Sequence, residues 1–320
     1  MLHQQKSSFL GDSRAIRELR RTALRLADAP FPIVIEGETG TGKFELALLI
    51  HERSSRSSDP FVDIHSANLS DELFEATLFG NERGAFTDAR QRRIGRVEAA
   101  ACGTLLFDEI DCLTLTQQAK FLRFVDRRRF ERVGGVETLR TDAAFLFATN
   151  RDLRELAEDG LFRNDLLARI SWIVLRIPPL RERTGDIALL ATLLLEETRS
   201  TFGQPRVRWS AAAMDMLRSH SWPGNVRELK ALVTVVSFLH SGGDTVEEFE
   251  VAAALPQARG NPGHSFVSAE ISSLVKLRTE TERRVITAAL TATAGNRVQA
   301  ARLLKIGRRT LQMKISKYGL

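Results

Sequence analysis

The pattern of hydrophobic and polar positions changes character near residue 180. Before that point, short apolar runs predict buried strands at PIVIEG (32–37), TLLFDEI (104–110) and AAFLFATN (143–150). Amphipathic stretches between them predict helices at Phe44–Glu52 and Leu115–Arg128. Buried strands that alternate with helices indicate an α/β fold with a parallel sheet.

After Pro178 the periodicity is helical, without strands, and predicts helices at Asp186–Phe202, Ser210–Ser219 and Val226–Leu239. The polar stretch PQARGNPGHS (256–265) indicates a linker, because it is rich in Pro and Gly. The last 48 residues are helical again. The predicted organisation is therefore an α/β subdomain at 1–178, a helical subdomain at 179–255, a linker at 256–272 and a small all-α domain at 273–320.

Composition narrows the class of protein. The 320 residues are 43% hydrophobic and 27% charged, which excludes a disordered or collagen-like chain. Two cysteines, Cys102 and Cys112, cannot build a disulfide framework, so we expect a reducing compartment. No apolar run approaches the roughly 18–20 residues of a membrane span, and MLHQQKSSFL lacks a secretory core. We expect a cytoplasmic protein with no membrane partner.

The net charge of +6 is unevenly distributed. Residues 273–320 hold eleven Lys or Arg against two Glu, a net charge of +9, which leaves −3 for the first 272 residues. A positive field concentrated on a small terminal domain favours a nucleic-acid partner. A solvated surface helix would give the same charge, so charge alone leaves both interpretations open.

Residues Gly37–Lys43 (GETGTGK) follow a predicted strand and open a predicted helix. Glycines let backbone N–H groups surround phosphate oxygens, and Lys43 would reach the β- and γ-phosphates. The hydroxyl residue that usually follows the lysine and binds magnesium is replaced by Phe44. The motif nevertheless predicts a phosphate-binding loop.

Acidic and polar residues follow two other predicted strands. Asp108 and Glu109 end the second, where one carboxylate can hold a metal ion and the other can orient an attacking water. Thr149 and Asn150 end the third, either as sensors of the γ-phosphate or, for Asn150, as a turn cap. Together with the phosphate loop, the acidic pair indicates hydrolysis of a nucleoside triphosphate.

Three arginines are further candidates. Arg163 and Arg169 flank an apolar pair, and they are either ordinary surface residues or groups that reach the γ-phosphate of a neighbouring subunit. In WPGNVREL, Asn225 is predicted to be a helix N-cap and Arg227 to lie in the first turn. A cation there opposes the helix dipole unless an anion such as a nucleotide phosphate is close.

Seven stretches, in order along the chain, resemble the motifs of the sigma-54-dependent transcriptional activators, which are bacterial enhancer-binding AAA+ ATPases. They are GETGTGK, LFGNERGAFTDA, GTLLFDEI, ATNRDL, FRNDLLARI, PPLRERTGDI and WPGNVREL, between about Phe9 and Val251. The tail AGNRVQAARLLKIGRRTLQMKI, from Ala294, is similar to the Fis-type helix-turn-helix of that family. The resemblance implies an AAA+ sheet with a helical lid and a small all-α DNA-binding domain.

The resemblance also implies ATP and Mg²⁺ as cofactors. It assigns nucleotide binding to Gly37, Glu38, Thr39, Gly40, Thr41, Gly42, Lys43, Phe44 and Arg227. Catalytic roles fall on Asp108 (Mg²⁺), Glu109 (water activation), Asn150 with Thr149 (sensor), and Arg163 and Arg169 (arginine fingers). Arginine fingers act across a subunit interface, so the active form implied is a hexameric ring.

Residues Gly84, Ala85, Phe86, Thr87, Asp88 and Ala89 match the family loop that contacts the sigma-54 RNA polymerase holoenzyme. In the family, movement of this loop during ATP hydrolysis converts the closed promoter complex into an open one. Phe86 is an aromatic residue among small ones in a charged segment. It could fold back onto its own domain, but a partner-binding anchor is the better interpretation.

Three positions depart from the family pattern: Asp88 replaces a glycine, Phe44 replaces a common Glu, and His65 replaces an Asn that senses the catalytic Glu. Asp88 adds charge and removes backbone freedom. The charge of the His65 imidazole can vary with pH, which makes it a candidate switch. We expect hydrolysis to be retained with altered regulation.

The tail predicts a first helix at Arg297–Leu304, a turn at 305–307 and a second helix at Arg308–Lys317. Candidate contacts to upstream DNA are Arg297, Arg308, Arg309, Thr310, Gln312 and Lys314. Such modules bind as dimers. With about eight residues before Phe9, we expect control by a negative-regulator protein or by abundance rather than by an attached sensor domain.

Two other functions remain possible on the sequence alone. The charge of Asp88 suggests a DNA-binding regulator that acts without sigma-54. Phe44 and His65 suggest a partly inactive subunit that needs a paralogue in a mixed ring. Promoter elements distinguish the first alternative, and mixing experiments distinguish the second.

Overall fold

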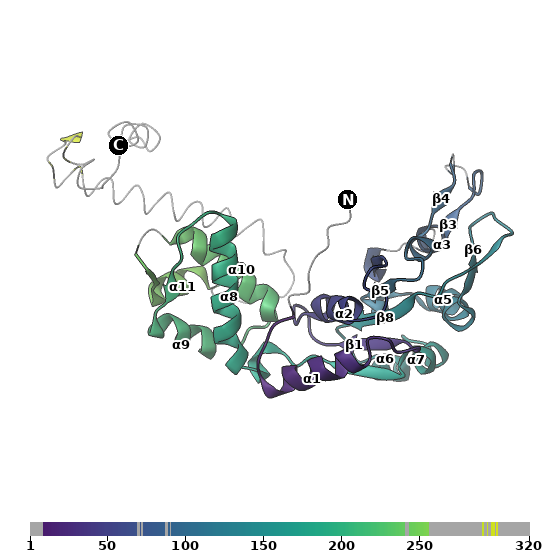
Figure 1. Ribbon diagram of the computed structural model, residues 1–320, viewed down its shortest axis with the longest axis horizontal. Coiled ribbons are helices and arrows are strands. Elements are labelled where there is room, and N and C mark those ends of the chain that lie inside the picture. Colours follow the sequence, from purple (N-terminus) through teal and green to yellow (C-terminus); the bar gives the residue numbers. More distant parts are fainter. Residues whose placement is uncertain are drawn as a thin grey trace. The chain divides into compact units, whose positions relative to one another are not determined.

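The computed structural model describes residues 9–68, 71, 73–86, 89, 91–240 and 243–255, and residues 290, 293, 296, 297 and 299. The chain divides into two compact units, Met1–Pro256 and Gln257–Leu320. The first unit contains a sheet part and a helical part, and nearly all described residues belong to it (Figure 1).

A five-stranded sheet with the order β2-β5-β8-β1-β9 forms the centre of the first unit. Its strands are β1 (Ile33–Glu36), β2 (Phe61–His65), β5 (Thr104–Asp108), β8 (Ala144–Thr149) and β9 (Ile173–Arg176). Every neighbouring pair is parallel. The carboxyl ends of all five strands therefore meet at one edge, where open α/β sheets bind ligands.

Helices cover both faces of this sheet, as side-chain alternation along the strands requires. On one face, Phe107 and Phe147 pack with Phe121, with ring centroids 4.7 Å apart for Phe107 and Phe121. On the other, Ile35 and Leu106 pack against the first helices. The helices of the sheet part, taking both faces together, are α1 (Arg14–Arg25), α2 (Lys43–Glu52), α3 (Phe74–Phe79), α4 (Arg96–Ala99), α5 (Leu115–Arg127), α6 (Leu153–Glu158) and α7 (Asn164–Ile170).

Two antiparallel pairs stand beside the main sheet: β3 (Gly80–Asn81) with β4 (Arg93–Ile94), and β6 (Arg129–Glu131) with β7 (Thr138–Arg140). An isolated bridge joins Asn81 to Val133, so the two pairs lie side by side (Figure 1). The segment between β3 and β4 holds the candidate partner-binding loop.

The helical part, or lid, has its own apolar core around the buried Trp222. Its elements are α8 (Gly185–Thr201), β10 (Arg208–Trp209), α9 (Ala211–Ser219), α10 (Asn225–Leu239), β11 (Thr245–Val246) and α11 (Glu248–Ala254). Short 3-10 helices lie at η1 (Ser66–Asn68), η2 (Ile110–Cys112) and η3 (Leu180–Glu182).

The α/β prediction and the three lid helices are confirmed, with helix ends that differ from the predicted ones by at most one residue. The expectation that no strands follow Pro178 is wrong. The parallel pair β10–β11 joins positions 37 residues apart, and two-residue strands leave no alternation to detect. No helix among the described residues is long and apolar enough to span a membrane.

Candidate nucleotide-binding site

The segment between β1 and α2 is a tight turn that requires glycine at two positions. Gly40 and Gly42 have φ angles of +79° and +105°, which side chains rarely tolerate. Gly42 is the N-cap of α2, and Lys43 is the first helical residue. Free N–H groups of the helix start therefore adjoin the loop, an arrangement that favours phosphate.

The Lys43 ammonium group is held over this loop. Its Nζ donates to the carbonyl oxygens of Gly37 at 2.7 Å and Glu38 at 3.2 Å. Burial lowers the pKa of Lys43, and the nearby carboxylate of Asp108 opposes that shift. The lysine is therefore positioned between the loop and the acidic end of β5.

A pocket of about 480 Å³ adjoins the loop, large enough for a nucleotide. Its polar lining includes most of the nucleotide-binding and catalytic residues predicted from the sequence. The polar lining residues are Thr39–Lys43, Glu45, His65, Asp108, Glu109, Asn150, Arg183, Glu197, Arg227 and Lys230. Its apolar lining is Phe9, Leu10, Phe44, Leu190, Leu194 and Val226. Apart from Phe44, the apolar lining could not be predicted from the sequence. Its residues lie far apart in the chain, before α1, on α8 and on α10, and come together only in the folded protein.

The acidic pair lies at the end of β5 as expected. Glu109 has a φ of +54°, and its N–H donates to Asp108 Oδ1 at 3.0 Å, so the chain turns sharply between them. His65 is paired with Asp108 in the strand register, and its Nδ1 lies 3.4 Å from Asp108 Oδ2. The imidazole also lies 3.6 Å from Asp63. The imidazole therefore lies beside Asp108, the predicted metal ligand, and Asp63 rather than beside Glu109.

Thr149 and Asn150 follow β8 at the same edge. Thr149 donates to Asp111 Oδ1 at 2.7 Å, and Asn150 Nδ2 lies 3.4 Å from Thr39 Oγ1 of the phosphate loop. The Asn150 side chain bonds across to the phosphate loop, and the N-cap of α6 is Asp152. Asn150 is among the residues that line the pocket.

Phe44 points into apolar surroundings rather than offering an oxygen ligand. Its ring meets Phe61 edge-on, with centroids 5.7 Å apart, and packs against the core on that face of the sheet. The missing hydroxyl is thus replaced by hydrophobic packing.

Arg163 and Arg169 are not among the residues that line this pocket. Arg163 forms two hydrogen bonds to Asp165, at 2.7 and 3.0 Å, and Arg169 lies 2.6 Å from Asp126. Both arginines are about 40% exposed. Their guanidinium groups are thus paired within the chain and at the same time partly exposed to another molecule.

The start of α10 corrects one prediction. Asn225 is not the N-cap; Gly224 is, and Asn225 is the first helical residue with a φ of +53°. The Asn225 side chain bonds instead to other segments, and the backbone N–H of Arg227 donates to the Gly40 carbonyl at 3.3 Å. Arg227 itself lines the pocket.

The candidate partner-binding loop is described at Gly84, Ala85, Phe86 and Ala89, whereas Thr87 and Asp88 lie outside the described residues. The N–H of Gly84 donates a hydrogen bond to the Ala89 carbonyl oxygen at 2.7 Å, so the first and last residues of the motif lie next to each other. Phe86 is 42% exposed, and Ala89 is buried. Phe86 is therefore partly available to a partner.

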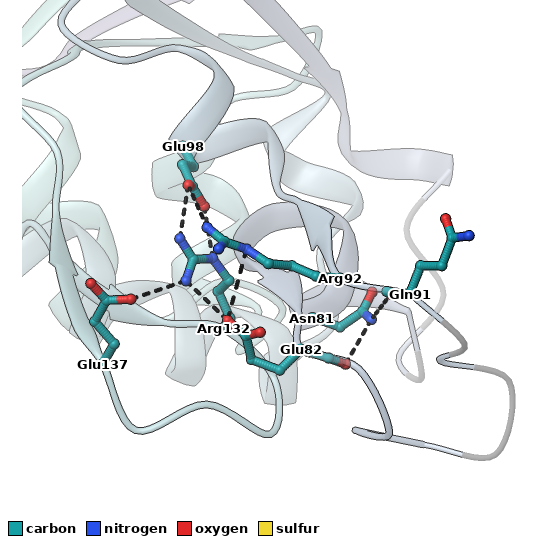
Figure 2. A network of polar contacts seen from close by, with 7 residues as sticks. All are labelled: Asn81, Glu82, Gln91, Arg92, Glu98, Arg132 and Glu137. Carbon is teal, nitrogen blue, oxygen red and sulfur yellow. Dashed lines mark hydrogen bonds and ion pairs between the residues drawn. The ribbon is translucent and has the colours of Figure 1, made fainter.

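A network of ion pairs lies at the base of this loop (Figure 2). The buried Arg132 donates two hydrogen bonds to Glu98, at 2.8 and 2.9 Å, and one each to Glu82 and Glu137. These bonds, above all those to Glu98, raise the pKa of Arg132, and they lower the pKa of Glu98. Arg132 could not be picked out from the sequence, because one arginine in the basic run RRRFER carries no distinguishing signal.

The predicted DNA contacts fall mostly outside the described residues: Arg308, Arg309, Thr310, Gln312 and Lys314 all do. Arg297 is described, exposed and helical. The Asn296 side chain accepts a hydrogen bond from the Gln299 N–H at 3.3 Å, a contact typical of a helix N-cap.

A parallel sheet with a glycine-rich loop after β1 and paired carboxylates after β5 defines the P-loop class of nucleotide-binding protein, here with a helical lid. Three family models match the chain: the Sigma-54 interaction domain at residues 9–176, the AAA+ ATPase lid domain at 181–265 and the Fis family of bacterial regulatory proteins at 277–318.

The chain is 39% identical to the DNA-binding transcriptional regulator NtrC of Azospirillum brasilense, over 96% of this chain and 68% of that protein. It is 37% identical to the regulatory protein AtoC of Escherichia coli K12, over 100% of this chain and 70% of that protein. The crystal structure of NtrX from Brucella abortus in complex with ATP superposes with a TM-score of 0.70 at 30% identity, covering 99% and 71% of the two chains. The chain belongs to the sigma-54-dependent transcriptional activator family.

Proposed function

We propose that this chain hydrolyses ATP, binds upstream DNA and remodels closed complexes of sigma-54 RNA polymerase into open complexes. The observation that carries the proposal is that residues with suitable chemistry, from different parts of the chain, line the same pocket. Lys43, the adjacent Asp108 and Glu109, Asn150 and Arg227 come from four separate segments and line one pocket beside a phosphate-binding loop. The ATP complex of the similar NtrX supports the choice of nucleotide.

In the proposed reaction, water attacks the γ-phosphorus, the bond to the β–γ bridging oxygen breaks, and ADP and phosphate leave. Lys43 and the loop N–H groups hold the phosphates, and Arg227 adds positive charge where negative charge develops. Glu109 orients the water and accepts its proton. Asn150 positions the γ-phosphate from the end of β8.

The residues present fit a magnesium ion that arrives with the nucleotide. Mg²⁺ is usually held by one or two carboxylates, with phosphates and waters completing its octahedron. Asp108 provides one such carboxylate, 21% exposed at the strand end. When bound, the ion would neutralise phosphate charge.

A ring of subunits supplies what one chain does not bring to its own pocket. Arg163 and Arg169 would exchange Asp165 and Asp126 for the γ-phosphate in a neighbouring subunit. Residues 84–89 would contact sigma-54 through Phe86, and residues 273–320 would bind DNA as a dimer. The proposed domain boundaries remain 1–178, 179–255, 256–272 and 273–320. The family models match 9–176, 181–265 and 277–318, so the lid model extends into the proposed linker.

The test is open-complex formation by the purified full chain on a sigma-54 promoter with holoenzyme and ATP, scored as heparin-resistant complexes. We expect opening by the wild type and none by Lys43→Ala. An ATPase rate no higher than that of Lys43→Ala would contradict the proposed hydrolysis.

The second candidate function is DNA-binding regulation without sigma-54, favoured by the charge that Asp88 adds to the loop. It would be supported by hydrolysis without opening. An Asp88→Gly variant that restores opening would identify this residue as the cause. Failure of both hydrolysis and opening, cured by a paralogue, would support a mixed ring.

A further inference from the structure

The lid forms hydrogen bonds to the backbone of the phosphate loop. Three successive loop carbonyls accept hydrogen bonds from it: Thr39 from Asn225 Nδ2 at 3.1 Å, Gly40 from the Val226 N–H at 2.9 Å, and Thr41 from Arg183 Nη2 at 2.9 Å. The Arg227 N–H is a second donor to Gly40. The approach is close, because a Cβ on Gly40 would lie 2.3 Å from the Gly224 carbonyl.

Asn225 is the centre of this contact. It is fully buried, and its Oδ1 accepts the Leu180 N–H at 2.7 Å. Its Nδ2 donates both to the Thr39 carbonyl and to Glu38 Oε2, each at 3.1 Å. One side chain thus joins the phosphate loop, the segment that enters the lid, and helix α10.

The direction of the loop carbonyls decides what the loop can bind. A peptide plane is rigid, so a carbonyl held toward the lid turns the N–H of the same plane away from it. A phosphate-binding loop needs several N–H groups turned to one side. The carbonyls of Thr39, Gly40 and Thr41 share their planes with the N–H groups of Gly40, Thr41 and Gly42. The Thr41 N–H closes a turn on the Glu38 carbonyl at 3.3 Å, and the lid bonds hold the N–H groups of Gly40 and Gly42 turned away from the lid.

We propose that Asn225 is a positioning residue that holds the phosphate loop in its nucleotide-binding shape from the lid side. The inference rests on the proposed function for the identity of the ligand. It assigns Asn225 no contact with the nucleotide; its effect passes through the loop backbone.

Two substitutions separate the contacts of Asn225. Asn225→Gly keeps the left-handed backbone and deletes the side chain. Asn225→Asp keeps the acceptor for Leu180 but places a carboxylate oxygen against Glu38 and the Thr39 carbonyl. Glu38→Gln, added to the aspartate variant, supplies an amide donor in place of the repelling carboxylate.

The measurement is calorimetric titration of the full chain with MgADP, which needs no turnover, and thermal unfolding of the free protein monitors folding. We expect each single Asn225 variant to bind MgADP about 10-fold more weakly or worse, because buried partners lose their hydrogen bonds. Glu38→Gln should recover part of the loss in the aspartate variant and none in the glycine variant.

The matched control is Arg181→Gln. Arg181 also pairs with Glu38, at 2.6 Å, but the pair is exposed and touches no loop carbonyl. This variant should bind MgADP within about 2-fold of the wild type.

The proposal is overturned if Asn225→Gly binds MgADP as well as the wild type does. It is also overturned if Glu38→Gln fails to improve the aspartate variant, or if Asn225→Gly does not fold, since the residue is then needed for the lid itself. Hydrolysis by the wild type is measured separately. Intact MgADP binding without turnover counts against the proposed function alone.

Discussion

The phosphate loop and the loop at residues 84–89 are both glycine-containing turns, but the protein holds them differently. The phosphate loop is held along its length, by Lys43 over its start and by lid donors on three successive carbonyls. The second loop is held at its base by the Arg132 network, and Phe86 is partly exposed. A loop that does chemistry needs fixed groups, whereas a loop that meets a partner needs an accessible side chain.

The largest expected effect is on the ATPase rate, at the acidic pair that lines the pocket with the phosphate loop. Glu109→Gln should lower the ATPase rate by about 100-fold or more, because the amide cannot accept the proton of the attacking water. MgADP affinity should stay within about 3-fold, since the phosphates are held by the other loop groups. Steady-state phosphate release and calorimetry measure the two. Normal turnover in this variant would exclude Glu109 as the base.

A smaller effect is expected at the base of the second loop. Arg132→Met removes a guanidinium that serves three carboxylates and should destabilise this segment by about 2 kcal/mol. The midpoint temperature of thermal unfolding should fall by about 4–8 °C. Promoter opening should decrease, whereas the affinity for MgADP should be unchanged.

Arg92→Met is the control for this prediction. Arg92 is 54% exposed and lies 3.7 Å from the same Glu98, so its removal should cost about 0.5 kcal/mol. Equal effects of the two substitutions would show that burial of Arg132 has no special importance.

Phe86→Ala tests the exposed end of the same loop. Loss of an aromatic anchor should weaken binding to sigma-54 by about 10-fold, measured by pull-down titration with a transition-state analogue of ATP. The ATPase rate should be unchanged. The control is Val136→Ala, on the neighbouring hairpin, where the side chain is 96% exposed. An equal loss in both variants would locate the contact on the hairpin as well.

The smallest effect is a pH dependence. Because Arg132 lowers the pKa of Glu98 in the folded protein, this pair stabilises the fold fully above the ordinary glutamate pKa of about 4.3. Its contribution is lost as pH falls below that value through the folded-state pKa. The stability difference between wild type and Arg132→Met should therefore shrink from about pH 5 to pH 3 in urea titrations. A constant difference would mean that Glu98 titrates normally.

Much of the fold could be predicted because its signals are local. Buried strands β1, β5 and β8 are apolar runs, and α8, α9 and α10 show helical periodicity. The role of Asn225 could not be predicted in this way. Its position before an apolar helix is typical of an N-cap, but its contacts lie 45 and 186 residues away.

The amino-acid sequence by itself determined the family, the order of the subdomains and the residues with suitable chemistry for ATP, because motifs and periodicity are properties of neighbouring positions. Only the tertiary structure decided that the lid supplies donors to the phosphate loop and that Arg132 is buried among three carboxylates. It also decided that Arg163 and Arg169 face their own aspartates. The lid donors and the phosphate loop are remote in sequence and meet only when the sheet and the lid pack. The Arg132 cluster forms by packing within the sheet part, and the Arg163–Asp165 pair depends on how two nearby side chains are placed at the start of α7.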